Sequence, residues 1–195
     1  MPPSNRKDQI IDSALKLFRT MGFANVSTRD LADDAGLSRS HIYHYFADWN
    51  ELRREAFLRF ANAQLQEVGA LVAGMQPDDA LRAFLRNCLP AKGDDAWVLW
   101  LDAWDEAMHD PALAKTYQAV DEQWQQMLAT LIDHGVEAGV FRCSSSRRAA
   151  RQLFFLAIGY ANDLMLRQSD QAAAEAEAEL MEVADLLLGT HPAPA

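Results

Sequence analysis

The sequence predicts an all-α protein on three observations. Apolar residues recur at helical spacing, as Ile10, Ile11, Ala14, Leu15 and Phe18 do near the start. No segment of useful length shows the alternation typical of a strand. Proline, glycine and serine separate the apolar-periodic segments. After three short N-terminal helices, further helices are expected over residues 50–73, 78–90, 94–108, 112–138, 145–168 and 172–188.

The composition is that of a soluble globular protein, with 50% hydrophobic and 24% charged residues. No run approaches 18 apolar residues, and the N-terminus lacks the apolar run of a signal peptide, so we expect a cytoplasmic protein with no membrane partner. Cys88 and Cys143 lack CxxC spacing and are expected to be buried or incidental thiols in a reducing cytoplasm, not a disulfide or a redox sensor.

The net charge of −10 is unevenly distributed along the chain. Residues 1–60 hold nine Lys/Arg and eight Asp/Glu, whereas residues 61–195 hold nine and twenty. A near-neutral N-terminal part can still bind nucleic acid if its cations share one face, so the charge alone does not decide the function.

Two short helices near the N-terminus have helix-turn-helix spacing. Ser27 and Asp30 predict a capping box, Gly36 ends that helix, and Ser38 caps the next. A step of about 100° per residue divides the second helix into two faces. The inner face holds Ser38, Ile42, Tyr45 and Phe46; the outer face holds Ser40, Tyr43 and His44, flanked by Arg39 and His41. Hydroxyls, rings and cations on the outer face are what a recognition helix needs to contact bases and phosphates.

Other interpretations of this segment are weaker. His41 and His44 could share a metal, but no third ligand is evident nearby. A catalytic histidine would need a nucleophile or an acid–base partner, and the sequence marks none. Tyr45 and Phe46 are expected to belong to the core, whereas Tyr43 is not.

The longer run VSTRDLADDAGLSRSHIYHYFADWNELRREAF, preceded by IIDSALKLFRTMGF, resembles the DNA-binding domain of the TetR family of bacterial regulators over residues 5–60. The resemblance implies a homodimer that reads a palindromic double-stranded operator with a head of residues 1–48. Residues 49–195 would then bind a small-molecule effector and dimerise. The DNA contacts implied by the family are Thr28, Arg29, Arg39, Ser40, His41, Tyr43 and His44.

One position departs from that family pattern. Trp49 stands where members usually carry a phosphate-binding lysine, and its indole carries no charge. Arg53 and Arg54, one turn later, are candidates to compensate for the missing cation. Arg6 and Lys7 could contact the DNA backbone as an N-terminal arm; the alternative for all four cations is a solvated surface charge.

A tryptophan-rich segment suggests an effector site. Helical spacing aligns Trp97, Trp100, Leu101, Trp104 and Met108, with Asp105 at the edge; Tyr117 and Trp124 follow on the next helix. Indole faces beside a carboxylate suit an organic cation. The candidate ligand residues are Trp100, Trp104, Asp105, Tyr117 and Trp124, and the alternative is that these rings are core. Residues 97–142 resemble the TetR subgroup that includes the choline-responsive repressor of betaine synthesis.

The last two helices point to self-association. Residues 153–166 are apolar nearly all round, and Leu180, Val183, Leu187 and Leu188 form a stripe. A four-helix dimer interface would cover these surfaces, as in the TetR family; the alternative is that they form the core of a monomer.

We therefore expect a ligand-responsive DNA-binding transcriptional regulator, a repressor released by a small molecule. The sequence contains no P-loop, GxGxxG, GxSxG, HExxH or paired-cysteine motif, so we expect neither an enzyme nor a metal or other cofactor. The alternative is a helical small-molecule-binding or interaction protein that has lost operator binding, which the acidic charge and Trp49 would fit.

Overall fold

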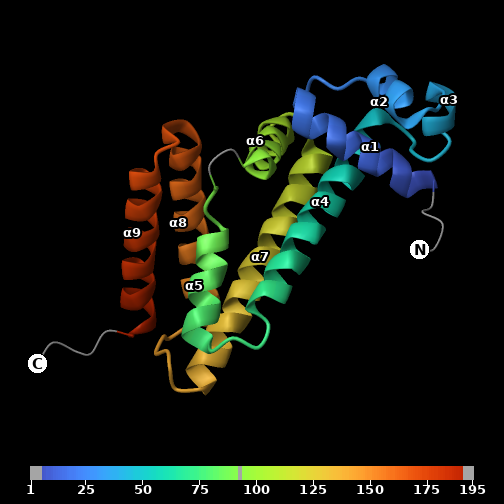
Figure 1. Ribbon diagram of the computed structural model, residues 1–195. Helices are drawn as coiled ribbons and strands as arrows, with labels where there is room; N and C mark the ends of the chain where they lie inside the picture. Colours follow the sequence, from blue (N-terminus) through green and yellow to red (C-terminus); the bar gives the residue numbers. More distant parts are fainter. Residues whose placement is uncertain (1–5, 92–93, 191–195) are drawn as a thin grey trace, which may run out of the picture. The chain divides into compact units, whose positions relative to one another are not determined.

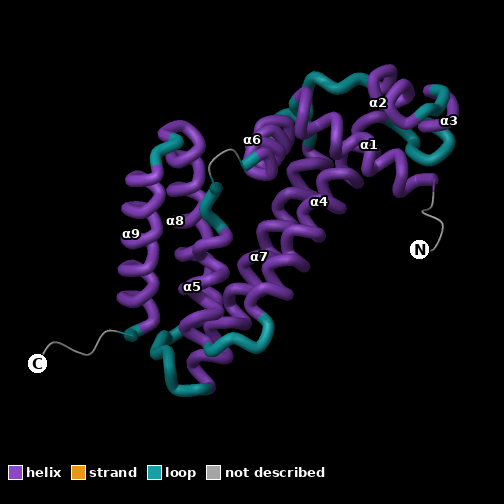
Figure 2. Tube along the Cα trace, viewed as in Figure 1, coloured by secondary structure: helices purple, strands orange, loops and turns teal. Residues whose placement is uncertain are grey.

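The computed structural model describes residues 6–91 and 94–190, which form helices and loops with no strand among them (Figures 1 and 2). The all-α prediction is thereby confirmed. The helices are α1 (Arg6–Met21), α2 (Thr28–Ala35), α3 (Arg39–Ile42), α4 (Trp49–Val72), α5 (Pro77–Asn87), α6 (Asp95–Ala107), α7 (Pro111–Glu137), α8 (Ser146–Arg167) and α9 (Asp170–Leu188). None of these described helices is both long enough and apolar enough to cross a membrane.

The chain divides into two compact units. Unit 1 comprises Met1–Gln64 and Asp94–Val120, and unit 2 comprises Leu65–Gly93 and Asp121–Ala195. Helices α4 and α7 each contribute a segment to both units. The sequence-based division at residue 48 falls immediately before α4 and remains a prediction about which residues bind DNA and which bind ligand.

The core of unit 1 holds together the three-helix head and α6. Helix α1 packs against α2 and α6, and α2 contacts α3. The apolar side chains predicted at helical spacing in α1 are buried, and Phe18 stacks against Phe23 with ring centroids 4.6 Å apart. The largest fully buried side chains here are Ile10, Phe18, Phe23, Leu31, Ile42, Phe46, Leu52, Phe57 and Leu99.

Capping residues and a glycine determine where α2 and α3 begin and where α2 ends. The Ser27 hydroxyl accepts a hydrogen bond from the Asp30 amide, and the Asp30 carboxylate accepts from the Ser27 amide, which completes the predicted capping box. The Ser27 hydroxyl also donates to the Asp30 carboxylate at 2.6 Å, and this bond, together with the one from the Ser27 amide, lowers the pKa of Asp30. Gly36 adopts a φ of 63°, a left-handed conformation that glycine reaches without strain, and so ends α2. Ser38 caps α3 by accepting from the His41 amide at 3.2 Å.

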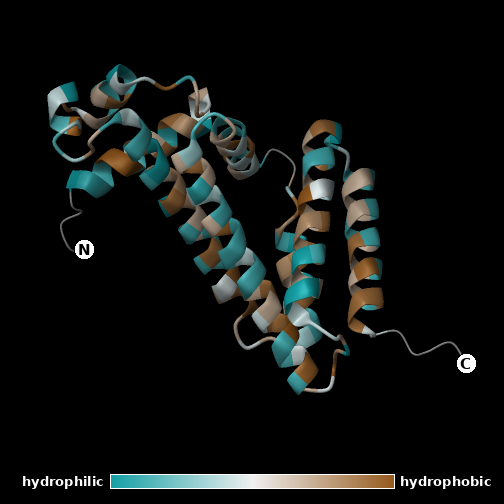
Figure 3. Ribbon diagram, turned by 180° about the vertical axis from the view of Figure 1, so that it is seen from behind, coloured by the Kyte–Doolittle hydropathy of each residue, from teal (hydrophilic) through white to brown (hydrophobic). Residues whose placement is uncertain are grey.

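Unit 2 is built around α5, α8 and α9. Arg82 and Arg86 on α5 pair with Asp185 and Glu177 on α9. Gly135 allows Phe141 to fold back onto α7, since a Cβ at Gly135 would lie 2.0 Å from the Phe141 ring. Hydrophilic and hydrophobic residues are mixed along the helices (Figure 3). In α8 the side facing α9 and α5 is buried, whereas Phe155 and Leu166 stay exposed.

Candidate nucleic-acid interface and aromatic cluster

The recognition segment comprises α3 and the turn that follows it, residues 43–46. Its inner side is fixed by Ile42 and Phe46, each 1% exposed. Helical hydrogen bonding continues past α3, because the Phe46 amide donates to the Ile42 carbonyl. The five predicted contact residues of this segment, Arg39, Ser40, His41, Tyr43 and His44, are all exposed. The buried side chains of Ile42 and Phe46 therefore anchor the segment, and its polar side chains face solvent. Ser38 departs from the expected inner face, because it caps the helix and is exposed.

A hydroxyl pair joins α2 to the recognition segment. The Thr28 and Tyr43 hydroxyl oxygens lie 3.1 Å apart, and the Tyr43 side chain is otherwise largely open, with the residue 45% exposed. Arg29, the next residue of α2, is exposed and lies 3.9 Å from the Asp33 carboxylate. The structure thus places all seven predicted DNA-contact residues on the head, with Thr28 and Tyr43 in contact.

The two histidines of the recognition segment are arranged around Tyr45. The His41 ring stacks on Tyr45 at 6.0 Å, and the His44 ring meets it edge-on at 5.2 Å. Both imidazoles are exposed, so their remaining edges are free to meet a ligand such as DNA. Across residues 6–91 and 94–190, no group of three His, Cys, Asp or Glu side chains is placed to hold a metal ion.

Trp49 contributes to the core of the head. Its half-buried ring lies edge-on to Phe18, with centroids 6.4 Å apart. Lys7 lies 2.7 Å from the Glu55 carboxylate and 5.0 Å from the Phe46 ring, so its ammonium is held close to the recognition segment. Arg6 is exposed and donates to Gln9 at 3.1 Å.

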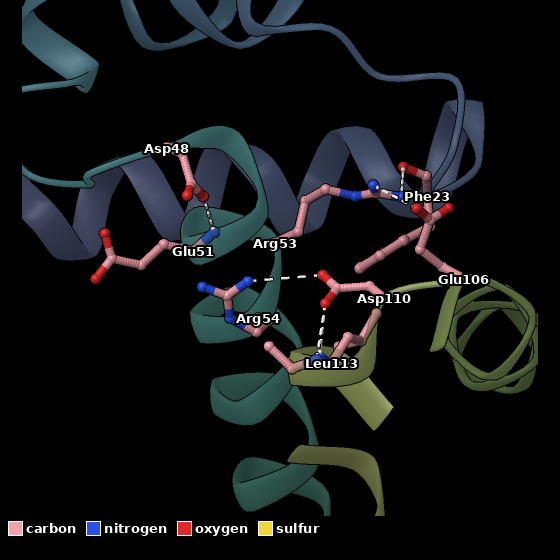
Figure 4. A network of polar contacts seen from close by, with 9 residues as sticks. Phe23, Asp48, Glu51, Arg53, Arg54, Glu106, Asp110 and Leu113 are labelled. Atoms are coloured by element: carbon pink, nitrogen blue, oxygen red, sulfur yellow. Dashed lines mark hydrogen bonds and ion pairs between the residues drawn. The ribbon is translucent and has the colours of Figure 1, made fainter. Parts of the chain in front are cut away.

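Arg53 corrects one expectation from the sequence. It is not a solvent-facing cation that could replace a phosphate contact, because it is only 8% exposed and donates to Glu106 at 2.8 Å (Figure 4). Its guanidinium also lies 4.6 Å from the Phe23 ring. Arg54 pairs with Asp110 at 3.6 Å, and Asp110 in turn caps α7 through the Ala112 and Leu113 amides. Both arginines therefore link α4 to the segment containing α6 and α7.

Two carboxylates of α6 hold the turn between α1 and α2. The Phe23 amide donates to Asp102 at 2.9 Å, and Arg53, itself bound to Glu106, approaches the Phe23 carbonyl at 3.5 Å. The hydrogen bond from Arg53 lowers the pKa of Glu106. We call Asp102, Glu106, Arg53 and Phe23 the α6 clamp. Sequence reasoning missed it, although the four-residue spacing of Asp102 and Glu106 placed both acids on one face of a helix.

An aromatic cluster is built from α4, α6 and α7. Trp100 on α6 contacts Phe57 and Phe60 on α4, with centroids 5.3 and 5.4 Å away. Tyr117 stacks on Phe57 at 5.2 Å and lies edge-on to Trp100 at 5.8 Å. The structure therefore brings together Trp100 and Tyr117, two of the predicted ligand residues. The structure adds Phe57 and Phe60 to this cluster. In the sequence, only their three-residue spacing, which places both on one face of a helix, indicated that they lie together.

The other predicted ligand residues have different surroundings. Trp104 is 53% exposed and Asp105 is also exposed, both on α6 in unit 1. Trp124 belongs to unit 2, where it is buried and its ring lies 5.7 Å from Phe84. Trp124 thus contributes to the core of its own unit.

A short recognition segment, anchored by buried apolar residues and capped at the preceding turn, is the architecture of a helix-turn-helix transcription regulator. Residues 10–56 match the family described as "Bacterial regulatory proteins, tetR family", and residues 77–189 match "BetI-type transcriptional repressor, C-terminal". The chain belongs to the TetR family of transcriptional regulators, with a C-terminal part of the BetI type. This is a family of regulators and not of enzymes.

Curated relatives agree with that assignment. The chain is 31% identical over 124 residues to the HTH-type transcriptional regulator BetI of Ectopseudomonas mendocina, covering 60% of this chain and 63% of that protein. It is 29% identical over 160 residues to BetI of Pseudomonas paraeruginosa, covering 79% and 78%. The matched region therefore spans a little under two thirds of the length of the first relatives, at 63% and 62%.

Solved structures share the fold. A putative transcriptional regulator from Saccharomonospora viridis, in complex with choline, aligns with a TM-score of 0.80 at 23% identity over 93% of this chain and 96% of that one. A TetR transcription regulator from Haloarcula marismortui aligns with a TM-score of 0.83 at 21% identity over 95% and 99%. At these identities the likeness shows the fold alone.

Proposed function

We propose that this protein is a cytoplasmic repressor that binds a palindromic double-stranded DNA operator as a homodimer and is released by a small molecule. The observation that carries the proposal is the exposed polar surface of the recognition segment. Ser40, His41, Tyr43 and His44 supply donors, acceptors and rings for base edges, while Arg29 and Arg39 supply charge for phosphates. Thr28, at the start of α2, extends the same surface.

We propose an organic cation as the effector. Trp100 and Tyr117 offer π-faces that attract a soft cation, and the exposed Asp105 beside Trp104 supplies a negative charge on the same helix. The related structure from Saccharomonospora viridis holds choline, a ligand of this chemical class. A role for Trp124 stays a prediction that the same experiment tests.

The α6 clamp and the aromatic cluster together suggest how an effector acts on the head. Phe57 lies one turn after Arg53 on α4, and Trp100 precedes both clamp carboxylates on α6. A ligand that shifts α6 against α4 would strain the Arg53–Glu106 ion pair and the Phe23–Asp102 hydrogen bond together. The turn before α2 would then be released, and with it the recognition segment. Tens-fold weaker operator binding requires a coupling free energy of only about 2 kcal/mol.

Operator binding is tested by fluorescence anisotropy with a selected duplex at several salt concentrations. Affinity that falls steeply with salt, and that is lost in Tyr43→Ala with the fold intact by circular dichroism, supports the proposal. Absence of any sequence-specific complex favours the alternative, a helical ligand-binding protein without operator binding.

Effector binding is tested by tryptophan fluorescence with choline-like and polyamine ligands. Saturable quenching is expected for the parent, and binding weaker by at least tenfold is expected for Trp100→Ala. The affinity of Trp124→Phe decides whether that ring also contacts the ligand. Reciprocity supplies a second check, because a ligand that weakens operator binding must itself bind more weakly to the operator complex. A ligand that binds without changing operator affinity would contradict the switch.

A further inference from the structure

Arg19, near the C-terminal end of α1, is a cation whose partner is an aromatic ring. Its guanidinium carbon lies 5.8 Å from the centroid of the Phe60 ring on α4. The two acidic side chains of α1, Asp8 and Asp12, both pair with Arg59 instead. No carboxylate in the described part of the chain pairs with Arg19, so a cation–π contact is the interaction that the structure gives this charge.

The ring beneath Arg19 belongs to the aromatic cluster. Phe60 lies 5.4 Å from Trp100, the central ring of that cluster, and Phe60 itself is only 2% exposed. Arg19, in contrast, is exposed. An exposed side chain that lies over a buried ring can move away without unpacking the core. The face of Phe60 that Arg19 leaves would then be open to another cation.

Arg19 also lies close to the turn that the α6 clamp holds. It precedes Phe23 by four residues, and the Phe23 amide is bound by Asp102 while its carbonyl faces Arg53. The contact with Phe60 therefore ties to α4 the end of α1 that leads into this turn. Loss of that contact would remove one of the interactions that hold the turn, and with it the start of α2, in place.

We infer that Arg19 is a built-in competitor at the cation-binding aromatic cluster, and that an organic cation binds by displacing its guanidinium from Phe60. The inference rests on the organic-cation effector of the proposed function and adds the group with which that effector competes. A guanidinium is delocalised and less strongly hydrated than an ammonium, so it stacks on rings readily. A quaternary ammonium or a guanidinium compound is therefore expected to replace Arg19 more effectively than a strongly hydrated primary amine.

A competitor and a supporting residue have opposite effects on affinity. Removal of a cation that competes for the ring strengthens effector binding, whereas removal of a residue that only supports the site weakens it. An exposed cation–π contact corresponds to a difference in affinity of about two- to fivefold. The coupling between effector and operator should fall by the same factor in a chain without Arg19, because the contact that the effector breaks is already absent.

Substitution of Arg19 in the full-length chain tests the competition. Isothermal titration calorimetry measures the affinity for choline, tetramethylammonium and methylguanidinium in the parent and in Arg19→Gln, which is polar but uncharged. Arg19→Gln should bind each cation that the parent binds about two- to fivefold more tightly. Arg19→Lys keeps a charge that stacks less well, so its affinities should lie between those of the parent and Arg19→Gln. The factor by which choline weakens operator binding, measured by fluorescence anisotropy, should be smaller in Arg19→Gln.

The matched control is Lys16→Gln, which removes a cation from α1 one turn before Arg19. Lys16 pairs with Asp34 on α2, so its loss should leave the three affinities unchanged. Cation binding by Arg19→Gln that is unchanged or weaker overturns the inference and leaves the organic-cation effector standing. Equal strengthening by Lys16→Gln also overturns it, because net charge would then be the cause. A folded parent that binds none of the three cations overturns the inference together with the proposed effector.

Discussion

Arg53 on α4 and Glu106 on α6 form a 2.8 Å ion pair in which the arginine is only 8% exposed. The guanidinium also faces the ring and the carbonyl of Phe23, and the Phe23 amide is bound by Asp102. The backbone amide and the backbone carbonyl of Phe23 are thus both held by carboxylates of α6. Asp102 binds the amide directly, and Glu106 holds the Arg53 side chain that faces the carbonyl. A movement of α6 cannot leave that turn unchanged, because a buried guanidinium without its carboxylate is costly.

Loss of the Glu106 charge is predicted to destabilise the protein. Glu106→Gln should lower the free energy of unfolding at pH 7 by about 2–3 kcal/mol, less than for a fully buried pair because Glu106 is partly exposed. The pKa of Glu106 is lowered in the folded state, so this stabilisation is present above its unfolded value and is lost as pH falls through the folded pKa. Urea denaturation at pH 7 and below pH 4 measures both effects.

The double variant Arg53→Met with Glu106→Leu serves as the control for that prediction. An apolar pair of similar size should restore most of the stability that Glu106→Gln loses. If Glu106→Gln is as stable as the parent at pH 7, the ion pair does not hold α6 to the head.

The Thr28–Tyr43 contact is predicted to matter for operator binding and hardly at all for stability. Tyr43→Phe removes one exposed hydroxyl, so the melting temperature should stay within about 2 °C, since surface changes usually cost under 0.5 kcal/mol. Operator affinity should fall about tenfold per head, or about a hundredfold for the dimer, as expected for one lost hydrogen bond of about 1–1.5 kcal/mol per head. A cycle with Thr28→Val shows whether the two hydroxyls act together; additive losses would mean that each contacts DNA independently.

The salt dependence of operator binding should report the charge of Arg39 and the charge carried at position 49. Arg39→Ala should lower the slope of log affinity against log salt by about one per head, or about two per dimer. Trp49→Lys should raise that slope by the same amount, because it restores a cation at a position that is half-buried against Phe18. It should also cost stability through the lost ring packing. A slope unaffected by Arg39→Ala would remove Arg39 from the set of phosphate contacts.

Asp121 on α7 is predicted to make stability depend on pH. Burial raises its pKa to about 7. The unfolded value is about 3.9, so between pH 4 and 7 the folded chain holds the proton more tightly, and stability falls as pH rises through this window. Asp121→Asn should be more stable than the parent at pH 8, by up to about 4 kcal/mol at 1.4 kcal/mol per pKa unit, and equally stable at pH 4. Identical pH profiles for parent and variant would contradict the prediction.

The head was largely predictable because its determinants are local. The Ser27–Asp30 capping box, Gly36 and Ser38 are short-range signals, and helical spacing separated the buried Ile42 and Phe46 from the exposed Tyr43 and His44. Helical spacing also placed Trp100 on an apolar stripe. Helical spacing could not show which aromatic rings of that stripe contact residues of another helix.

What the sequence could not supply are pairings between distant segments. The Arg53–Glu106 and Phe23–Asp102 contacts join residues 53 and 79 positions apart, and no local pattern marks such partners. For the same reason Arg53 was expected at the surface and is in fact buried. The burial of Trp124 in the core of unit 2, against Phe84, likewise depends on tertiary packing.

The central claim, that the recognition segment reads a specific operator, is tested most directly by selecting bound DNA from a random duplex pool with the parent chain and with Tyr43→Ala. We predict that the parent enriches a palindrome whose half-sites are about one helical turn or a multiple of it apart, and that the variant, folded and dimeric, fails to retain it. A folded, dimeric parent that enriches no sequence would contradict the claim, and the protein would then be a helical ligand-binding protein without operator binding.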